Sequence, residues 1–381
     1  MPLLSTYYPT IPYNQLKVWV LAPSIETNDS NIDYYYDFSQ SITEYTKAFE
    51  ELDIEWKWQP VTIKNYRSII NVIAKEKLKS AKIPLVFNLC DGDEVNGAPG
   101  ISIIKLLEEK DILYTGSDEY FYEITTSKIL MKQAFDKASV PTPAWQAITE
   151  ERQNLKPVIE KLGSPTIVKP AISGGSMGVG IKNVVKNEGE LSEQVTRMFK
   201  GYRGWDLCNG GIVAEKFING PEFTTLIVGS SNNPEQSIIY PPVERVFHPS
   251  LPETEQFLSF DRLWEIYEEE SEMPDNGNFY EYKKPNRFVQ KKIMKISWDA
   301  YCSVGGTGYT RIDLRMDKET GKIYVLEVNA QCGLSEDENY TSIGAILRFA
   351  GKSFSQLITE IINDAFTKQT HKLVAANNKT R

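Results

Sequence analysis

The first part of the chain alternates short apolar runs with amphipathic segments. Three apolar runs of strand length are each followed by a segment in which apolar residues have helical spacing. The predicted strands are residues 17–23, 54–58 and 83–89, with a short last strand at 111–117. The predicted helices are residues 37–51, 66–79 and 100–110. Strands that alternate with helices predict a parallel sheet with crossover helices, so we expect an α/β unit here.

The remainder of the chain has a mixed pattern that predicts α+β structure. A helix is expected at about 123–137, and the prolines of SVPTPAW mark a boundary after it. Further predicted elements are a helix at 188–200 and strands at 165–171, 178–184, 211–218, 222–229, 306–316 and 322–330. The first two of these strands flank a glycine-rich loop, and the last two flank the turn DKETGK, so each couple predicts a hairpin. Residues 248–287 are polar and predict a long loop or lid with helical pieces, and two helices close the chain.

Composition narrows the class of protein. Hydrophobic residues make up 41% and charged residues 24% of the chain, as in ordinary globular proteins. The net charge of -9 provides no basic excess for nucleic-acid phosphates, and no apolar run approaches the ~20 residues of a membrane span. The four cysteines are widely spaced and the first residues lack a secretory pattern, so we expect free thiols in the cytoplasm. Two histidines are too few for a histidine metal cluster.

The glycine-rich stretch SGGSMGVG begins at Ser173 and raises the question of phosphate binding. A Walker A loop needs GxxxxGK[ST], and this loop has no lysine after its last glycines. A dinucleotide-binding loop opens a helix, whereas a strand-like run follows here. What remains is a hairpin whose backbone N–H groups could fold over phosphate oxygens, helped by Ser173, Ser176 and the charge of Lys169. A plain hairpin with glycines at positive φ explains the stretch equally well.

Two strands near the end of the chain carry acidic and amide side chains. Residues two apart in a strand share a face, so Arg311 and Asp313 point the same way, as do Glu327 and Asn329. The residues predicted to point away from Glu327 are Tyr324, Leu326 and Val328. If the strands pair, Asp313, Glu327 and Asn329 converge and form an oxygen-ligand set suited to Mg²⁺. A solvated strand face is the alternative, but the apolar surroundings of the acid favour a metal.

A third stretch, GIVAEKFINGPEFTT, places backbone polar groups beside apolar side chains. The strand end from Glu215 to Ile218 could receive the edge of an adenine ring, and Glu222 could meet a ribose. Taken alone, the stretch is better explained as an ordinary strand and turn.

The order of these motifs resembles the ATP-grasp carboxylate–amine ligases, and most closely the D-alanine–D-alanine ligases. The landmarks cover the chain from about Leu85 to its end and read VFNLCDG, ILYTGS, TTSKILMK, VPTP, IVKP, SGGSMGVG, AEKFINGPEFT, FYEY, RIDL and LEVNAQCG. The resemblance implies a three-domain ATP-grasp fold that begins with a Rossmann-like pre-ATP-grasp domain. The implied domains are a substrate domain at 1–122, a central domain with the glycine loop at 123–212, and a domain with the metal site at 213–381. ATP would bind between the last two.

The resemblance also implies residue roles. The residues implied to bind ATP are Lys128, Lys169, Ser173, Gly174, Gly175, Ser176, Met177, Gly178, Glu215, Lys216, Phe217, Ile218 and Glu222. In this set the lysines meet phosphates, the loop closes over the γ-phosphate, the strand end forms the adenine hinge and the last glutamate meets the ribose. The implied ligands of two Mg²⁺ ions, for which Mn²⁺ could substitute, are Asp313, Glu327 and Asn329. The implied catalytic residues are Arg311 and Gly333, which would stabilise an oxyanion, with Ser176 and Lys284, or Lys283 in another register.

The implied reaction joins a carboxylate to an amine with release of ADP. The carboxylate of an amino acid or peptide would attack the γ-phosphoryl group, and an amine would then attack the acyl phosphate through a tetrahedral oxyanion. The implied partners are small molecules rather than nucleic acid or membrane, and a homodimer stays open. An ATP-binding scaffold without activity, and a kinase that stops at phosphorylation, stay as alternatives.

Three places depart from the pattern of that family. Asp91 and Gly92 stand where the family has a His-Gly pair. The amino-terminal glutamate that meets the first substrate's ammonium has no clear counterpart, and Glu26 is a candidate. In place of serines for the second substrate's carboxylate, this chain has the acidic residues 336–338. A solvated face explains such a run first, but acids near a site attract cations, so we hypothesise a substrate that carries an amine or basic group and is not D-alanine.

Overall fold

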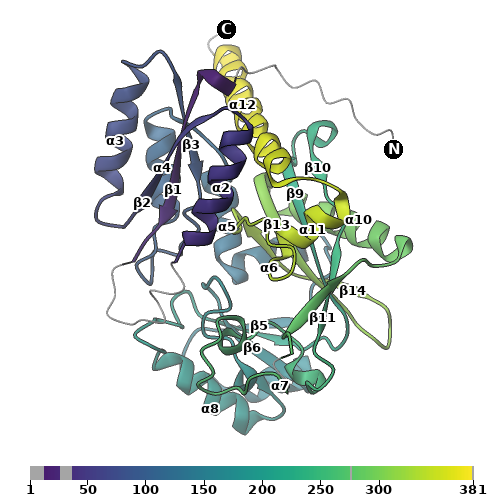
Figure 1. Cartoon of the computed structure of the whole chain (residues 1–381). Helices are drawn as coiled ribbons and strands as arrows, with labels where there is room; N and C mark the ends of the chain where they lie inside the picture. Colours follow the sequence, from purple (N-terminus) through teal and green to yellow (C-terminus); the bar gives the residue numbers. More distant parts are fainter. Residues whose placement is uncertain (1–12, 26–36, 275–276, 380–381) are drawn as a thin grey trace.

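The computed structural model describes residues 13–25, 37–274 and 277–379, which form three sheets that follow one another along the chain (Figure 1). The first sheet is parallel and the other two are antiparallel. The predicted α/β first part and α+β remainder are therefore confirmed. Among the described residues, no helix combines the length and apolar character that crossing a membrane requires.

The parallel sheet has the strand order β2-β1-β3-β4. Its strands are β1 (Leu16–Pro23), β2 (Glu55–Val61), β3 (Ile83–Asn88) and β4 (Leu113–Tyr114). Helix α2 (Ser39–Glu51) packs on one face, and α3 (Tyr66–Lys77) and α4 (Ile101–Glu109) pack on the other. All of these elements were predicted, because each apolar run is buried between two layers of helices. Ligands of such sheets gather beyond the carboxyl ends of the strands, here beside β1 and β3. The candidate Glu26 in the loop after β1 lies outside the described residues.

The second sheet has the order β5-β8-β6-β7. Its strands are β5 (Trp145–Ile148), β6 (Thr166–Pro170), β7 (Val184–Val185) and β8 (Ile212–Lys216), and it packs against α7 (Lys156–Leu162) and α8 (Glu188–Phe199). The hairpin of β6 and β7 is present, but the strand predicted at 178–184 is reduced to its last residue. A 3-10 turn replaces it, because Asn183 Nδ2 donates to the carbonyls of Val168 and Gly178 at 2.7 and 3.0 Å and folds the chain back. The sequence analysis did not predict β5 or α7.

The third sheet has the order β12-β11-β9-β13-β14, with β10 paired to β9. Its strands are β9 (Glu222–Ser230), β10 (Ile238–Ile239), β11 (Val243–Phe247), β12 (Tyr280–Lys283), β13 (Thr307–Met316) and β14 (Ile323–Ala330). The predicted hairpin of β13 and β14 is confirmed. The polar stretch at 248–287 contains the short helix α9 (Phe260–Leu263), as expected, but also the unpredicted strand β12. Strand β11 was missed because its buried face includes Arg245, which interrupts the apolar alternation.

The single helix predicted at about 123–137 is wrong in detail, because two helices occupy this part of the chain. They are α5 (Glu119–Thr126) and α6 (Lys128–Lys137). Ser127 separates them with an extended backbone, bridges to Ile172, and caps α6 by accepting a hydrogen bond from the Leu130 N–H. Together with the unpredicted α10 (Arg287–Ser303), these helices pack on one face of the third sheet.

The last two helices join the first and third sheets. Helix α11 (Ser342–Ala350) and the start of α12 (Phe354–Lys379) share one core with β1, α2, β9 and β13. Figure 1 shows α12, in yellow, running beside α2 of the parallel sheet. The sheet that carries Asp313 is thereby fixed against the parallel sheet, so loops from both can face one site.

Candidate functional site

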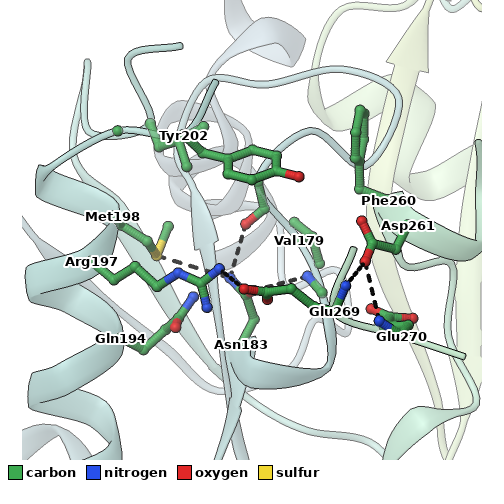
Figure 2. A pocket seen from close by; sticks show the side chains of 14 residues that line it. Val179, Asn183, Gln194, Arg197, Met198, Tyr202, Phe260, Asp261, Glu269 and Glu270 are labelled. Carbon is green, nitrogen blue, oxygen red and sulfur yellow. Dashed lines mark hydrogen bonds and ion pairs between the residues drawn. The ribbon is translucent and has the colours of Figure 1, made fainter. Parts of the chain in front are cut away.

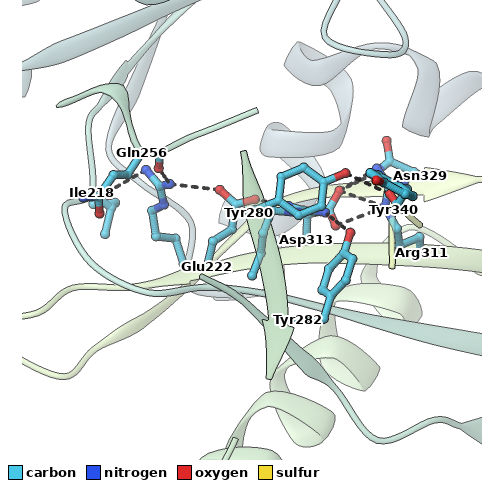
Figure 3. Close-up of polar contacts among 11 residues, drawn as sticks. Ile218, Glu222, Gln256, Tyr280, Tyr282, Arg311, Asp313, Asn329 and Tyr340 are labelled. Carbon is cyan, nitrogen blue, oxygen red and sulfur yellow. Dashed lines mark hydrogen bonds and ion pairs between the residues drawn. The ribbon is translucent and has the colours of Figure 1, made fainter. Parts of the chain in front are cut away.

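Strands β13 and β14 bring the three predicted metal ligands together. Their register sets Asp313 opposite Glu327, and Arg311 opposite Asn329. Asn329 Nδ2 donates to Asp313 Oδ2 at 2.9 Å, and Arg311 donates to both carboxylate oxygens of Asp313, with Nη2 at 2.8 Å from Oδ2 (Figure 3). The side-chain convergence expected from strand periodicity is therefore present.

A β-bulge changes the predicted faces of β14. The register shifts between Asp313 and Leu314, which makes Leu326 the extra residue on the opposite strand. Tyr324 consequently lies opposite Arg315, on the side of the sheet that carries Asp313. Tyr324 was predicted to point away from that side, and this is wrong because strict alternation holds only where the ladder is regular.

Two arginines keep Asp313 ionised. Burial by itself would raise the pKa of this carboxyl, but Arg311 and Arg245 outweigh burial and lower it below its ordinary value. Burial acts to lower the pKa of Arg311, yet the carboxylate of Asp313 raises it above its usual range. The acid therefore presents a negative charge that is already oriented by the protein.

The donor set fits a hard divalent cation such as Mg²⁺. The Asn329 nitrogen faces Asp313, so the amide oxygen is the atom that a metal would use, together with the two carboxylates. Within the described part of the chain, no group of three or more His, Cys, Asp or Glu side chains could hold a metal ion. A cation bound here would complete its coordination with water and substrate phosphates, which is the usual behaviour of Mg²⁺.

Lys128 stands between the acid pair and the glycine loop. It is the first residue of α6, and its N–H donates to the Ala171 carbonyl at 2.8 Å. Its Nζ lies 3.6 Å from Glu327 Oε2 and donates to the Ser173 carbonyl at 3.2 Å. One buried lysine thus contacts both the strand of Glu327 and the glycine loop.

The glycine loop, residues 173–178, is a compact turn. The Val179 N–H donates to the Ser176 carbonyl at 2.9 Å. Ser176 has φ of 62°, which is uncommon for a residue other than glycine, and Gly178 has φ of 73°. A Cβ added to Gly178 would lie 2.7 Å from the side chain of Leu207. Turn geometry and close packing therefore explain this glycine whether or not the loop binds phosphate.

Residues 259–270, which we call the strap, pack behind the glycine loop. Trp264 Nε1 donates to the Gly175 carbonyl at 3.0 Å, and the Phe260 N–H donates to the Val179 carbonyl at 2.8 Å. The strap also forms ion pairs, which join Glu269 to Lys182 and Arg197, and Glu268 to Arg203. Part of the polar stretch that was predicted as a loop or lid therefore covers the outer side of the glycine loop.

A cavity lies between the strap and α8 (Figure 2). Val179, Asn183, Arg197, Tyr202 and Glu269 are among its lining residues. Of the described residues, those that line it include neither Lys128 nor Lys169, and none of the three predicted metal ligands. The cavity therefore lies behind the glycine loop and away from the acid pair.

A buried ion cluster fixes the base of the predicted nucleotide site. The carboxylate of Glu215 lies 3.3 Å from Lys132 Nζ and 3.8 Å from Lys169 Nζ. Burial would raise the pKa of Glu215, but these two lysines lower it, whereas burial lowers the pKa of Lys132 in spite of Glu215. Lys132 was not predicted, although it follows Lys128 by four positions and so shares its helix face.

The predicted adenine hinge continues from β8 with several polar groups already bonded. The Lys216 N–H donates to the Ala144 carbonyl at 2.8 Å, and the Phe217 N–H donates to the Pro165 carbonyl at 3.0 Å. The carbonyl of Ile218 accepts from Arg315 Nη1 at 3.2 Å. A base that binds here would therefore use the remaining backbone groups of the hinge.

Glu222, predicted to meet a ribose, is buried between two arginines. Arg245 Nη1 donates to one carboxylate oxygen and Arg315 Nη2 donates to the other, the latter at 2.9 Å. A carboxylate oxygen can accept a second hydrogen bond, so contact with ribose stays a prediction. The sequence analysis missed both arginines, although Arg315 follows Asp313 by two positions and could have been placed on its face.

The remaining predicted catalytic residues lie at the ends of strands. A Cβ added to Gly333, after β14, would meet no atom within 4 Å, so its backbone borders open space. Lys284 follows β12 and is exposed, while the alternative Lys283 pairs with Glu281 at 2.6 Å. Their catalytic roles stay predictions.

The loop after β3 enters the same region from the parallel sheet. Gln331 Nε2, two residues before Gly333, donates to the Cys90 carbonyl at 2.8 Å, and the Tyr122 hydroxyl donates to the Gly92 carbonyl at 2.7 Å. These contacts hold the backbone on both sides of Asp91. The Asp91 side chain is exposed, yet the protein that surrounds it disfavours its charged form and raises its pKa to about 6.

The acidic run that begins at Glu336 is engaged by neighbouring groups. Glu336 pairs with Lys47 at 3.1 Å, and Glu338 lies 3.9 Å from Arg348. Asp337 accepts hydrogen bonds from the backbone N–H groups two and three residues after it, which closes a turn. The run therefore behaves as a paired and solvated surface, the explanation that the sequence analysis preferred.

Comparisons with known proteins find related sequences. A family profile described as D-ala D-ala ligase C-terminus matches residues 134–363. A D-alanine–D-alanine ligase of Marinomonas sp. (strain MWYL1) is 26% identical over 295 residues, which cover 77% of this chain and 80% of the relative. Another, of Thermoanaerobacter sp. (strain X514), is 29% identical over 297 residues, which cover 76% of this chain and 73% of the relative.

Solved structures show the same fold. The D-alanine–D-alanine ligase of Bacillus anthracis complexed with ATP superposes with a TM-score of 0.64 at 18% identity, covering 93% of this chain and 99% of that one. The enzyme of Coxiella burnetii gives 0.65 at 16% identity, with 96% and 99% covered. The three-domain architecture expected from the motifs is therefore the fold of this chain.

Proposed function

Because the matching family profile spans more than half of the chain, the protein belongs to the D-alanine–D-alanine ligase family, and we propose that it joins two amino acids, or an amino acid and a peptide, through an acyl phosphate. It is an ATP-dependent carboxylate–amine ligase of the ATP-grasp class and acts on small molecules. The proposal concerns which carboxylate and amine are joined, and which residues do the work.

One observation carries the assignment of residues. Asp313, Glu327 and Asn329 converge on one sheet face, and Lys128 links that face to the glycine loop at Ser173. Acids, an amide and a lysine in this arrangement suit a triphosphate with its metal. Retention of the whole set argues against a scaffold that has lost activity, since a scaffold has no need to hold buried charges together.

In this proposal ATP lies between the second and third sheets. Lys128 and Lys169 bind phosphates, and residues 173–178 close over the γ-phosphate with Ser176 as a donor. The hinge at Glu215–Ile218 receives the adenine, and Glu222 meets the ribose with its remaining lone pairs. Asp313, Glu327 and Asn329 would hold up to two Mg²⁺ ions, or Mn²⁺, and these would neutralise phosphate charge. Lys284 would add a further positive charge.

Arg311 and Gly333 act in the second half of the proposed reaction. The substrate carboxylate attacks the γ-phosphorus and ADP leaves. The amine then attacks the acyl carbon, and the negative charge that develops on the former carbonyl oxygen is met by the Arg311 guanidinium and the Gly333 N–H. The intermediate collapses as its C–O bond to phosphate breaks and the amine gives up a proton, which leaves the amide and inorganic phosphate. Asp313 orients Arg311 with Nη2 at 2.8 Å, so this donor is in place before the reaction begins.

The domains at 1–122, 123–212 and 213–381 are proposed to divide the work as substrate, lid and metal domains. The three sheets support this division, except that β8 (Ile212–Lys216) pairs with β5 and β6, which favours a boundary just after Lys216.

All four cysteines are free in the structure. This supports the further proposal of a reducing compartment such as the cytoplasm.

Product analysis tests the proposed reaction. The protein is incubated with ATP, Mg²⁺ and a mixed pool of D- and L-amino acids, and products are identified by mass spectrometry while ADP is measured. A new dipeptide with one ADP per bond is expected. ADP with a stable phosphorylated carboxylate would indicate a kinase, and no ADP with any substrate would indicate a scaffold.

Asp91 gives the substrate proposal its structural basis. Since Glu336 and Glu338 are already paired, they no longer support a cationic substrate. Asp91 remains, with its side chain exposed and its backbone held on both sides, and Arg311 acts against the rise of its pKa. We propose that Asp91 receives the ammonium of one substrate, or a basic group on its side chain.

Exchange of Asp91→Asn tests this role, with Asp53→Asn as the control. Asp53 is exposed and has φ of 51°, which asparagine also tolerates. Loss of a charged contact should raise the apparent KM for the amino-acid substrate by about 10- to 100-fold in the first variant only. In the wild type this KM should also rise as pH falls through about 6 and Asp91 becomes protonated. Equal use of D-alanine by the wild type and the first variant would contradict the proposal.

A further inference from the structure

A row of three buried charges crosses the third sheet beside the proposed nucleotide site. Glu222 on β9 lies opposite Arg245 on β11 and opposite Arg315 on β13. The three residues are 6%, 3% and 4% exposed. Both arginines donate to the carboxylate of Glu222, so the row consists of one acid clamped between two bases (Figure 3).

Arg315 has contacts that reach beyond this row. Its Nη1 donates to the Ile218 carbonyl of the hinge at 3.2 Å, and its Nη2 donates to the Gln256 carbonyl. Its guanidinium also lies 5.3 Å from the centre of the Phe217 ring. A single planar side chain therefore contacts the hinge and the polar stretch at 248–287 from the strand that carries Asp313.

Gln256 belongs to the short segment that leads into the strap. The strap begins three residues later and packs behind the glycine loop through Trp264 and Phe260. Arg315 is thus bonded to the base of the segment that covers the loop, and to the backbone that would line the adenine. Among the side chains, only arginine has enough N–H donors in one plane to donate to the Ile218 carbonyl, the Glu222 carboxylate and the Gln256 carbonyl at the same time.

The three charged side chains of the row also affect one another electrostatically. Burial lowers the pKa of Arg315, Glu222 raises it and Arg245 lowers it, while the guanidinium itself keeps its charge, as arginines in proteins do. Arg245 in turn helps to lower the pKa of Asp313. The row is therefore connected to the acid pair on the same sheet as well as to the hinge.

From these contacts we propose that Arg315 is a positioning residue, which sets the distance between the nucleotide hinge, the base of the strap and the strand of Asp313. It touches no reacting atom and acts through Ile218, Glu222 and Gln256. This inference rests on the proposed function, since it concerns the binding of ATP. The alternative is a structural role in the sheet alone, without effect on the nucleotide.

Two variants separate these roles. Arg315→Met fills the space without donors, and Arg315→Lys keeps the charge but loses the planar fork. If Arg315 positions the hinge, the KM for ATP should rise by about 10- to 100-fold in Arg315→Met, with kcat and the KM for the amino acid within about threefold of the wild type. Arg315→Lys should recover only part of the ATP affinity.

Arg262→Met is the matched control. Arg262 is also buried and lies in the strap, where it pairs with Glu255 and Glu270, but it contacts neither the hinge nor Glu222 among the described residues. Its loss should lower the melting temperature and leave the KM for ATP within about twofold. Limited proteolysis adds a second readout: ATP with Mg²⁺ should protect residues 248–274 in the wild type and in Arg262→Met, and much less in Arg315→Met.

The outcomes are distinct. A lower melting temperature in Arg315→Met with unchanged ATP affinity and unchanged protection would overturn the positioning role while leaving the ligase proposal intact. If Arg315→Met does not fold, Arg315→Lys with wild-type ATP affinity would overturn it. If the wild type neither binds ATP nor releases ADP with any amino acid, the proposed function fails, and the inference fails with it.

Discussion

The two sides of the proposed phosphate site are built in different ways. On one side, β13 and β14 place Asp313 opposite Glu327, and the hydrogen-bond ladder fixes both positions. On the other side, residues 173–178 form a turn that is held by a few backbone contacts and by the strap. The first side is therefore fixed by a regular ladder, whereas the second depends on a few separate contacts.

The charged residues that support the two sides also differ in how deeply they are buried. Glu222, Arg245 and Arg315 support the strand side and are almost fully buried, so each depends strongly on its partners. The pairs that join the strap to the residues around α8 are more open, with the Glu269 and Arg197 side chains 29% and 37% exposed, although the pair of Arg262 and Glu270 within the strap is buried. Buried pairs suit an arrangement that must not change, and exposed pairs suit one that opens and closes. A phosphoryl-transfer site needs both, because its acids must be oriented and its acyl phosphate must be kept from water.

The strongest test of the comparison is removal of an acid from the strand side. Glu327→Ala should lower ADP release by at least about 10³-fold, because the proposed metal would lose one of two carboxylates. The fold should persist, since Glu327 is only partly buried. ADP release with saturating substrates and the circular dichroism spectrum are the measurements.

Glu319→Ala is the control for that variant. Glu319 is an exposed acid in the turn between the same two strands, so it tests the loss of charge without the loss of a proposed ligand. It should release ADP at the wild-type rate. Wild-type turnover in Glu327→Ala would show that the acid pair does not bind the metal.

The same two sides show which parts of the fold and of the site the sequence pattern can predict. The parallel sheet and the convergence of Asp313, Glu327 and Asn329 could be predicted, because regular strands alternate their faces and a short turn sets their pairing. Prediction failed wherever a single side chain overrode the local pattern. Ser127 divides a helix, Asn183 turns the predicted strand at 178–184 into a tight turn, and the bulge at Leu326 moves Tyr324 to the face that was not predicted for it.

The supporting charges were harder to predict for another reason. Arg245 lies in a strand with a buried arginine, and such a strand has no clear alternation of apolar and polar residues. Its partnership with Glu222 depends on the register of β9 and β11, which are joined by residues 231–242, a connection that contains the short strand β10. Pairing across distant strands is therefore a product of the whole fold rather than of local sequence.

The next largest effect is expected on the loop side, at Gly178. An alanine there would meet Leu207 at 2.7 Å and would have to adopt φ of 73°. Gly178→Ala should therefore lower the free energy of unfolding by about 1–3 kcal/mol, measured by urea denaturation. Gly174→Ala is the matched control, because a Cβ there meets no atom within 4 Å. Equal stability of the two variants would mean that the loop is not held in the turn described.

The smallest effect is expected from the strap pairs, in the double variant Glu268→Gln with Glu269→Gln. It removes contacts with Lys182, Arg197 and Arg203, but exposed pairs of this kind contribute only about 0–1 kcal/mol each. The free energy of unfolding should fall by less than about 2 kcal/mol, and the rate of ADP release should change by less than about fivefold.

Salt provides the check on that variant. Added NaCl should move the wild-type rate toward that of the double variant, whose own rate should respond less, because screening and mutation weaken the same pairs. Asp299→Asn, which removes an exposed pair with Lys295 on α10, should leave the salt dependence as in the wild type. If the double variant lost as much ADP release as Glu327→Ala, the contrast between the two sides would be wrong. The strap would then be as necessary to the site as the strands that carry the acids.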